Sequence, residues 1–180
     1  MKKLDLTNVN EAGGTNNRRT PPAGGYVVTI WTVVDNPERE RLEMTYDIAE
    51  GDYKNYGANM MEQYGFNPLK LFKSYKTNAL PFFKRFLSAV TKSNPGFVWA
   101  DDENALINKK VGLVLGEEQY RKSSGDIRTR LFVDREMPVS RIREGDFTVP
   151  ELKKLPGTHP AAASALRPVQ LSDKELEDLF

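Results

Sequence analysis

GGYVVTIWTVVDNPERERLEMTYDI, residues 24–48, is the stretch that decides the fold. From Tyr26 to Val34 it is an unbroken run of β-branched and aromatic residues, which predicts a strand buried on at least one face. DNPERE predicts a turn. The last eight residues alternate between two sets that should face opposite sides of a second strand, Leu42, Met44, Tyr46 and Ile48 against Arg41, Glu43, Thr45 and Asp47. We therefore expect an antiparallel hairpin.

A helix and a second hairpin are expected further along the chain. Apolar residues at i, i+3, i+4 and i+7 predict a helix over about 81–93, ended by NPG: Phe83, Phe86, Leu87 and Val90. Two alternating segments around residues 111–133 are separated by SSGD and predict the second hairpin. The following residues, to about 155, should be irregular and packed on the body through Ile142 and Phe147.

The order of these elements predicts a fold class. A long aromatic connection, residues 50–78, joins the first hairpin to the helix. Within it, LKLFKSYK fits either a third strand or a turn of helix, and the pattern does not decide. Hairpin, connection, helix and hairpin is the order of the OB-fold, a five-stranded Greek-key barrel. We expect a mainly β, OB-fold-like barrel over residues 25–155, with one capping α-helix.

The two ends of the chain differ from this domain. Residues 1–24 are polar and rich in Asn and Gly, which predicts a flexible arm. Residues 156–170 form a Pro/Ala-rich tether, and residues 171–180 form an acidic tail that ends in an aromatic residue. Neither a signal peptide nor a membrane span is recognisable, and cysteine is absent. These features predict a cytoplasmic protein.

The tail divides the charge of the chain. Residues 1–172 carry a net charge of +4 and residues 173–180 a net charge of −3. An acidic peptide can occupy a basic groove until nucleic acid displaces it, while its tip docks on a partner protein. The residues expected to bind a partner are Asp173, Glu175, Glu177, Asp178 and Phe180. The alternative is an acidic end that only aids solubility, but an exposed terminal aromatic does not serve that purpose.

Cations and aromatic rings elsewhere suit a single-stranded nucleic acid, because cations bind phosphates and rings stack on bases. The candidates are Trp31, Lys70, Lys73, Tyr75, Lys76, Trp99, Arg121, Lys122, Arg128, Arg130 and Phe132. For each cation the alternative is a solvated surface charge, and for each tryptophan it is packing in the core.

No pattern indicates catalysis, a metal or a cofactor, so we do not expect an enzyme. Three adjacent acidic residues, 101–103, cannot all face one ion on regular structure, and no distant acidic motif completes a two-metal site. His159, the single histidine, stands among prolines and alanines, where a general base would have no fixed position. The glycines at 112 and 116 lack the Lys and Ser/Thr of a phosphate loop and suggest tight curvature instead.

Five segments between residues 22 and 155 also carry a resemblance to a known family: GGYVVTI, TYDIAEGDYKNY, FKRFLSAVTKSNPGF, VGLVLGEEQY and IREGDFTVPELKKL. They resemble a group of small phage early-region proteins, encoded among replication and recombination genes and related to phage single-stranded DNA-binding proteins with an OB-fold. The terminal DKELEDLF is similar to the acidic, Phe-ended tails of such DNA-binding proteins, in which the tip recruits replication and repair proteins.

These observations converge on one expected function. The chain should coat single-stranded DNA during replication or recombination, in the host cytoplasm if phage-encoded. Its tail should regulate DNA binding and recruit a polymerase, helicase or recombinase. The competing expectation is an OB-like adaptor that binds proteins and never DNA, and the modest charge of the body favours it. Whether the chain forms a homo-oligomer stays open.

Overall fold

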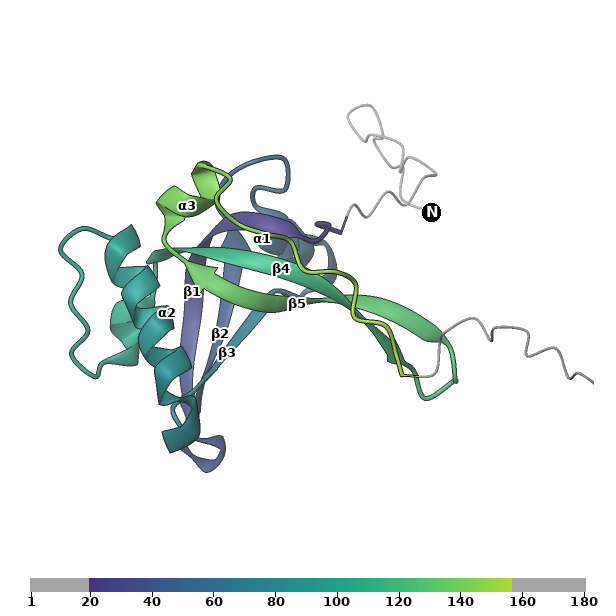
Figure 1. Ribbon diagram of the computed structural model, residues 1–180, viewed down its shortest axis with the longest axis horizontal. Helices are drawn as coiled ribbons and strands as arrows, with labels where there is room; N and C mark the ends of the chain where they lie inside the picture. The colour runs from purple at the N-terminus through teal and green to yellow at the C-terminus, as the bar shows by residue number, and fades with distance from the viewer. Residues whose placement is uncertain (1–19, 157–180) are drawn as a thin grey trace, which may run out of the picture.

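The computed structural model describes residues 20–156 (Figure 1). Residues 1–19 of the expected arm, residues 157–170 of the expected tether and the acidic tail lie outside the described residues. The described part is mainly β, as predicted, with five strands: β1 (Gly24–Asn36), β2 (Arg41–Ile48), β3 (Lys70–Ser74), β4 (Lys110–Arg121) and β5 (Ile127–Met137). It also has three α-helices, α1 (Tyr56–Tyr64), α2 (Leu80–Ser93) and α3 (Val139–Arg143).

The strands form one antiparallel sheet in the order β3-β2-β1-β4-β5. The long strand β1 is central and pairs with two strands: Gly24–Thr29 pairs with β4, and Val28–Asn36 pairs with β2. Figure 1 shows the consequence: β1, β2 and β3 cross β4 and β5 at a steep angle. Both hairpins predicted from the alternation are confirmed. Strands β3 and β5 are the two edges, and no backbone ladder joins them within residues 20–156.

The helix predicted at 81–93 is confirmed as α2, which contacts β3, β4 and β5 and covers one end of the bent sheet. Pro81 suits its first turn, where its missing N–H is not needed. Phe86, Ala89 and Val90 are buried against the sheet, while Phe83 and Leu87 are partly buried beside them. The aromatic stripe of this helix therefore belongs to the core, as expected.

The inner face of β2 carries the predicted apolar set, and Leu42, Met44, Tyr46 and Ile48 are all buried. On the opposite face one charged residue, Asp47, is also buried. Its carboxylate accepts hydrogen bonds from the backbone N–H groups of Gly57 at 2.6 Å and Ala58 at 3.2 Å. These N–H groups belong to the first turn of α1, which has no intrahelical acceptors for them. A carboxylate from a neighbouring strand thus caps α1.

Helix α1 was not predicted, and its sequence explains why. YGANMMEQY has no regular apolar stripe, and Gly57 is its only buried residue. Gly57 packs tightly, because a Cβ there would lie 3.0 Å from side-chain atoms of both Asp47 and Asn67, closer than a Cβ normally approaches. The helix depends on this tertiary contact more than on its local propensity.

The ambiguous segment LKLFKSYK contains a strand, β3, paired antiparallel with β2. The region after β5 is largely irregular, as expected, although it begins with the short helix α3. The predicted anchors also hold. Ile142 occupies the space beside Gly112, where a Cβ would lie 2.5 Å from its Cγ1, and the ring of Phe147 lies over Gly25 in the same way. The glycines in β1 and β4 therefore accommodate packed side chains.

Within residues 20–156, no helix combines the length and the apolar character that a membrane crossing requires.

Candidate functional site

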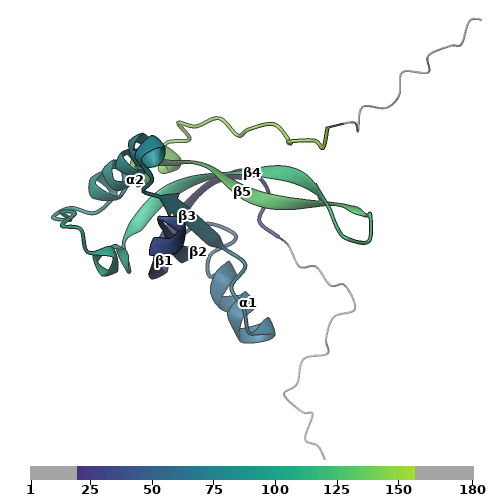
Figure 2. The ribbon, with the colours of Figure 1, turned by 90° about the horizontal axis from the view of Figure 1, so that it is seen from below.

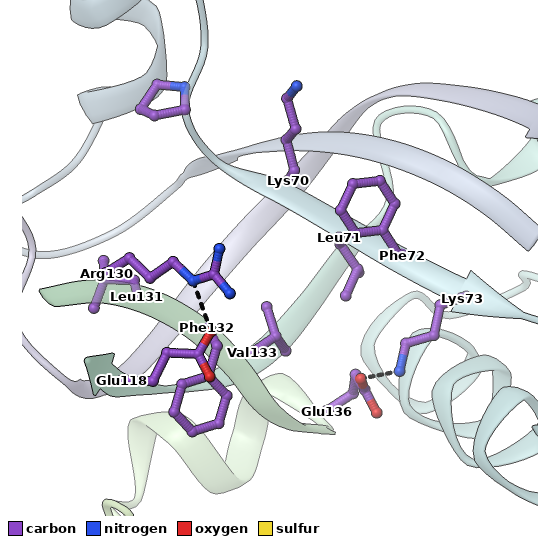
Figure 3. Close-up of a pocket in the computed structure, with 11 residues that line it drawn as sticks. Lys70, Leu71, Phe72, Lys73, Glu118, Arg130, Leu131, Phe132, Val133 and Glu136 are labelled. Atoms are coloured by element: carbon purple, nitrogen blue, oxygen red, sulfur yellow. Dashed lines mark hydrogen bonds and ion pairs between the residues drawn. The ribbon is translucent and has the colours of Figure 1, made fainter. Parts of the chain in front are cut away.

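A cleft of about 400 Å³ lies between the two edge strands, β3 and β5 (Figure 3). One wall is formed by Lys70, Leu71, Phe72 and Lys73 of β3. The other comes from the middle of β5, with a contribution from β4: Arg130, Leu131, Phe132, Val133, Glu136 and Glu118. Each edge strand has one side without a backbone partner in the described chain. The contacts between β3 and β5 across the cleft are therefore made by side chains.

Lys73 and Glu136 close one end of the cleft through a buried ion pair. Both residues point inward, since Lys73 is opposite Leu42 and Glu136 is opposite Leu113, two core positions. The second carboxylate oxygen of Glu136 faces Arg85 of α2 at 3.3 Å. A buried carboxylate is tolerated when it is paired, and here two cations pair with it.

The outer face of β3, beside the cleft, presents an aromatic ring together with cations. Phe72 is 47% exposed, and the guanidinium carbon of Arg41 lies 4.5 Å from the centroid of its ring. Two nitrogens of Arg41 donate to one oxygen of Glu43, which keeps the guanidinium over the ring. These hydrogen bonds from Arg41 lower the pKa of Glu43 below its ordinary value. Lys70 is exposed on the same face of β3 as Phe72.

Arg130 extends from β5 toward β3 and forms an ion pair of 2.7 Å with Glu118 (Figure 3). Its guanidinium carbon also lies 5.2 Å from the ring centroid of Tyr120. Further along the same hairpin, Arg121, Lys122 and Arg128 are exposed. None of these three forms an ion pair with another described residue. The β4–β5 hairpin extends well beyond the rest of the sheet and carries these cations with it (Figure 2).

The cleft brings together four of the candidates chosen from the sequence, Lys70, Lys73, Arg130 and Phe132. Three of them contact other side chains: Arg130 pairs with Glu118 but has 61% of its side chain exposed, whereas the other two are held more tightly. Lys73 is buried in its ion pair, and Phe132 lies under Lys153, whose Nζ is 3.5 Å from the ring centroid. Phe132 also fills the space beside Gly116. Lys70 and Arg130 therefore remain the more accessible cations of the cleft.

Tyr75 and Trp99 lie away from the cleft, at the side of α2. Both rings meet Phe83 edge-on, with centroids 6.4 and 6.0 Å apart respectively. The Tyr75 hydroxyl donates to Asp35 at 2.8 Å, and the Trp99 indole N–H donates to Asp101 at 2.9 Å. These partners favour the structural interpretation of both rings over a role in stacking.

The last two candidates, Lys76 and Trp31, lie outside the cleft lining. Lys76 is exposed just after β3 and begins the turn that leads into α2. Trp31 is half-buried in β1, at an irregularity in its pairing with β2. Its side chain forms no aromatic contact or hydrogen bond with another described residue.

Phe72 was missed by the sequence analysis although it is the most accessible ring in the cleft. Phe72 was not selected because the sequence pattern of LKLFKSYK did not distinguish a strand from a turn of helix. In a strand, Lys70 and Phe72 share one face while Leu71 and Lys73 share the other. The observed burial follows this pattern, with Leu71 and Lys73 buried. Treating the segment as a strand would therefore have added Phe72 to the predicted site and removed Lys73 from it.

The charge of the described part is nearly balanced, with 20 Lys+Arg against 19 Asp+Glu in residues 20–156. Any attraction to a polyanion must therefore arise from where the cations are placed. The acidic cluster at 101–103 is partly engaged in local hydrogen bonds, since Asp101 accepts from Trp99 and Asp102 from the backbone of Asn104. In the described chain, no three His, Cys, Asp or Glu side chains gather as a metal site would require. His159 lies outside the described residues.

No protein-family model matches this chain, and no curated protein is similar enough to it to count as a relative.

Proposed function

We propose that this protein binds single-stranded DNA through the β3–β5 cleft and the adjoining hairpin. The observation that carries the proposal is Phe72, an exposed ring held under Arg41 at the mouth of a cleft that Lys70 and Arg130 flank. Bases of a single strand can stack on such a ring, whereas paired bases in a duplex hide their faces in the helical stack. Nearby cations would bind the phosphates on either side.

The expected free energies of base stacking and phosphate contact correspond to a moderate affinity for single-stranded DNA. Stacking contributes about 1–3 kcal/mol per base, and each phosphate contact adds a term that weakens with salt. Since the net charge of the described part is only +1, binding should depend on a few placed cations and on stacking. This combination gives weak sequence preference, because every base has a π-face.

The strand arrangement supports the proposal that the domain is an OB-fold. In a five-stranded Greek-key barrel of this type, β1 lies between β2 and β4, and a helix between β3 and β4 covers one end. The observed order and the position of α2 have these features. The closing contact between β3 and β5 would here be made by Lys73 and Glu136 instead of a full backbone ladder.

The tail lies outside the described residues, and its function remains part of the proposal. The described chain ends beside the hairpin, since the backbone of Lys153 forms hydrogen bonds with Gln119 at 2.8 Å and Glu117 at 2.9 Å. The remaining 24 residues could span up to about 80 Å when extended. The acidic residues Asp173–Phe180 can therefore reach the hairpin and compete with DNA for it. We propose that DNA releases them to recruit replication or recombination proteins, as the resemblance to phage proteins implies.

The experiment is fluorescence anisotropy with a labelled thymidine oligomer and a matched duplex, at two salt concentrations. It compares the full chain with a chain that lacks residues 171–180. We expect a salt-sensitive preference for the single strand, and tighter binding after the deletion. Absence of binding by both chains would refute the DNA proposal. Unchanged affinity after the deletion would refute only the competition by the tail.

A protein-interaction adaptor is the second candidate function, and two observations favour it. The described part has almost balanced charge, and an apolar hollow of about 700 Å³ lies beside α2. Its walls include Leu80, Phe83, Leu87 and Trp99. The affinity of an adaptor for a protein should fall far less between low and moderate salt than the affinity for DNA.

A further inference from the structure

A second exposed ring with a guanidinium beside it lies on α2. Phe82 is 56% exposed, and the guanidinium carbon of Arg85 is 5.4 Å from the centroid of its ring. The two residues are three positions apart, so they share one side of the helix. The pair repeats the arrangement of Phe72 and Arg41 on the edge of the sheet.

This second pair adjoins the closed end of the cleft. Arg85 reaches Glu136 at 3.3 Å, and Glu136 forms the buried ion pair with Lys73. Lys73 and Glu136 both line the cleft, and Phe72, the neighbour of Lys73 in β3, lines it as well. A single continuous chain of contacts therefore connects the two exposed rings: Phe82, Arg85, Glu136, Lys73 and then the edge strand β3.

The charges at this junction leave one cation in excess. Lys73 is buried, with 11% of its side chain exposed, and it neutralises the carboxylate of Glu136. Arg85 has 49% of its side chain exposed and makes the longer of the two contacts with Glu136. Arg85 can therefore turn toward an anion in solvent without leaving Glu136 unpaired. The anion would bind next to the exposed ring of Phe82.

We propose that Phe82 and Arg85 form a second nucleotide subsite, in which a base stacks on Phe82 and the adjacent phosphate binds Arg85. The bound strand runs from the platform at Phe72, past the Lys73–Glu136 pair, to the platform at Phe82. This inference rests on the proposed function and extends its site from the sheet to the helix. Neither ring was among the residues selected from the sequence.

The test is the affinity of the full chain for thymidine oligomers of increasing length. Short oligomers fill the Phe72 platform alone, so the unmodified chain and the Phe82→Ala variant should bind them equally. Longer oligomers should bind the unmodified chain more tightly, and Phe82→Ala should lose that gain, roughly 5- to 150-fold. Leu80→Ala is the matched control, because Leu80 is 46% exposed on the same helix but lines the apolar hollow instead.

A second measurement separates the base contact from the phosphate contact. Arg85→Gln should reduce the slope of log affinity against log salt by about 1 for long oligomers, whereas Phe82→Ala should leave the slope unchanged. Equal loss for short and long oligomers in Phe82→Ala, or no loss at all, would overturn the second subsite while DNA binding itself stands. An unmodified chain that binds no oligomer would overturn the proposed function and this inference with it.

Discussion

Lys73 of β3 and Glu136 of β5 form an ion pair across the two edges of the sheet, and both side chains are almost inaccessible to solvent. The residues are 63 positions apart in the chain. Inward-pointing charges on edge strands discourage further strand pairing. The Lys73–Glu136 pair also links the two sheet edges directly, and both residues line the cleft between those edges.

Breaking this pair should destabilise the fold strongly. Lys73→Met leaves a buried carboxylate with only the more distant Arg85, so the free energy of unfolding should fall by about 3 kcal/mol. Replacing both partners, Lys73→Met with Glu136→Leu, removes the unpaired charge and should recover most of the loss. Urea denaturation measures both. Equal destabilisation by the single and the double variant would contradict the ion-pair explanation.

Phe72→Ala should weaken binding of single-stranded DNA by about 1–3 kcal/mol, because it removes one stacking platform. The melting temperature should hardly change, since nearly half of the residue is exposed. Phe66→Ala is the control, because Phe66 is similarly exposed but does not line the cleft. Anisotropy titrations of all three chains give the comparison. A loss of equal size in the control would show that the ring of Phe72 has no specific role.

Glu118→Gln should strengthen DNA binding. The change removes a carboxylate from the cleft and releases Arg130, whose ion pair with Glu118 is largely exposed and contributes little to stability. Removing one repulsive charge near a phosphate should improve the affinity by about 0.5–1 kcal/mol at low salt, and less at high salt. Glu117→Gln serves as the control, since this neighbour does not line the cleft. Weaker binding by Glu118→Gln would contradict the proposed path of the strand.

Asp47→Ala should destabilise helix α1 together with the end of β2. The change leaves the buried N–H group of Gly57 without its acceptor, at a cost of about 1–3 kcal/mol. Relative to the unmodified chain, Asp47→Ala should accelerate amide hydrogen exchange across α1 and leave the exchange across the β4–β5 hairpin almost unchanged. Asp52→Ala, an exposed change in the same connection, should have almost no effect. Unchanged protection of α1 in Asp47→Ala would mean that another contact holds the helix.

Local patterns were enough to predict much of the fold. Both hairpins and helix α2 follow from alternation, turn residues and an apolar stripe, all of which act between residues close in sequence. Helix α1 could not be predicted, because it lacks such a stripe and depends on Asp47 of another element. The site was predicted only in part: Lys70 and Arg130 lie in the cleft and remain accessible, while Tyr75 and Trp99 pack beside Phe83.

By itself, the sequence determined the two hairpins and helix α2, and which residue types are suited to meet a nucleic acid. Only the tertiary structure decided which of those residues are free to do so. Lys73 and Phe72 are neighbours, and a lysine is normally the exposed one of such a pair. Here the lysine is buried because Glu136, distant in the chain, supplies the opposite charge that makes burial tolerable. Phe72 then faces solvent because adjacent residues of a strand must point to opposite sides.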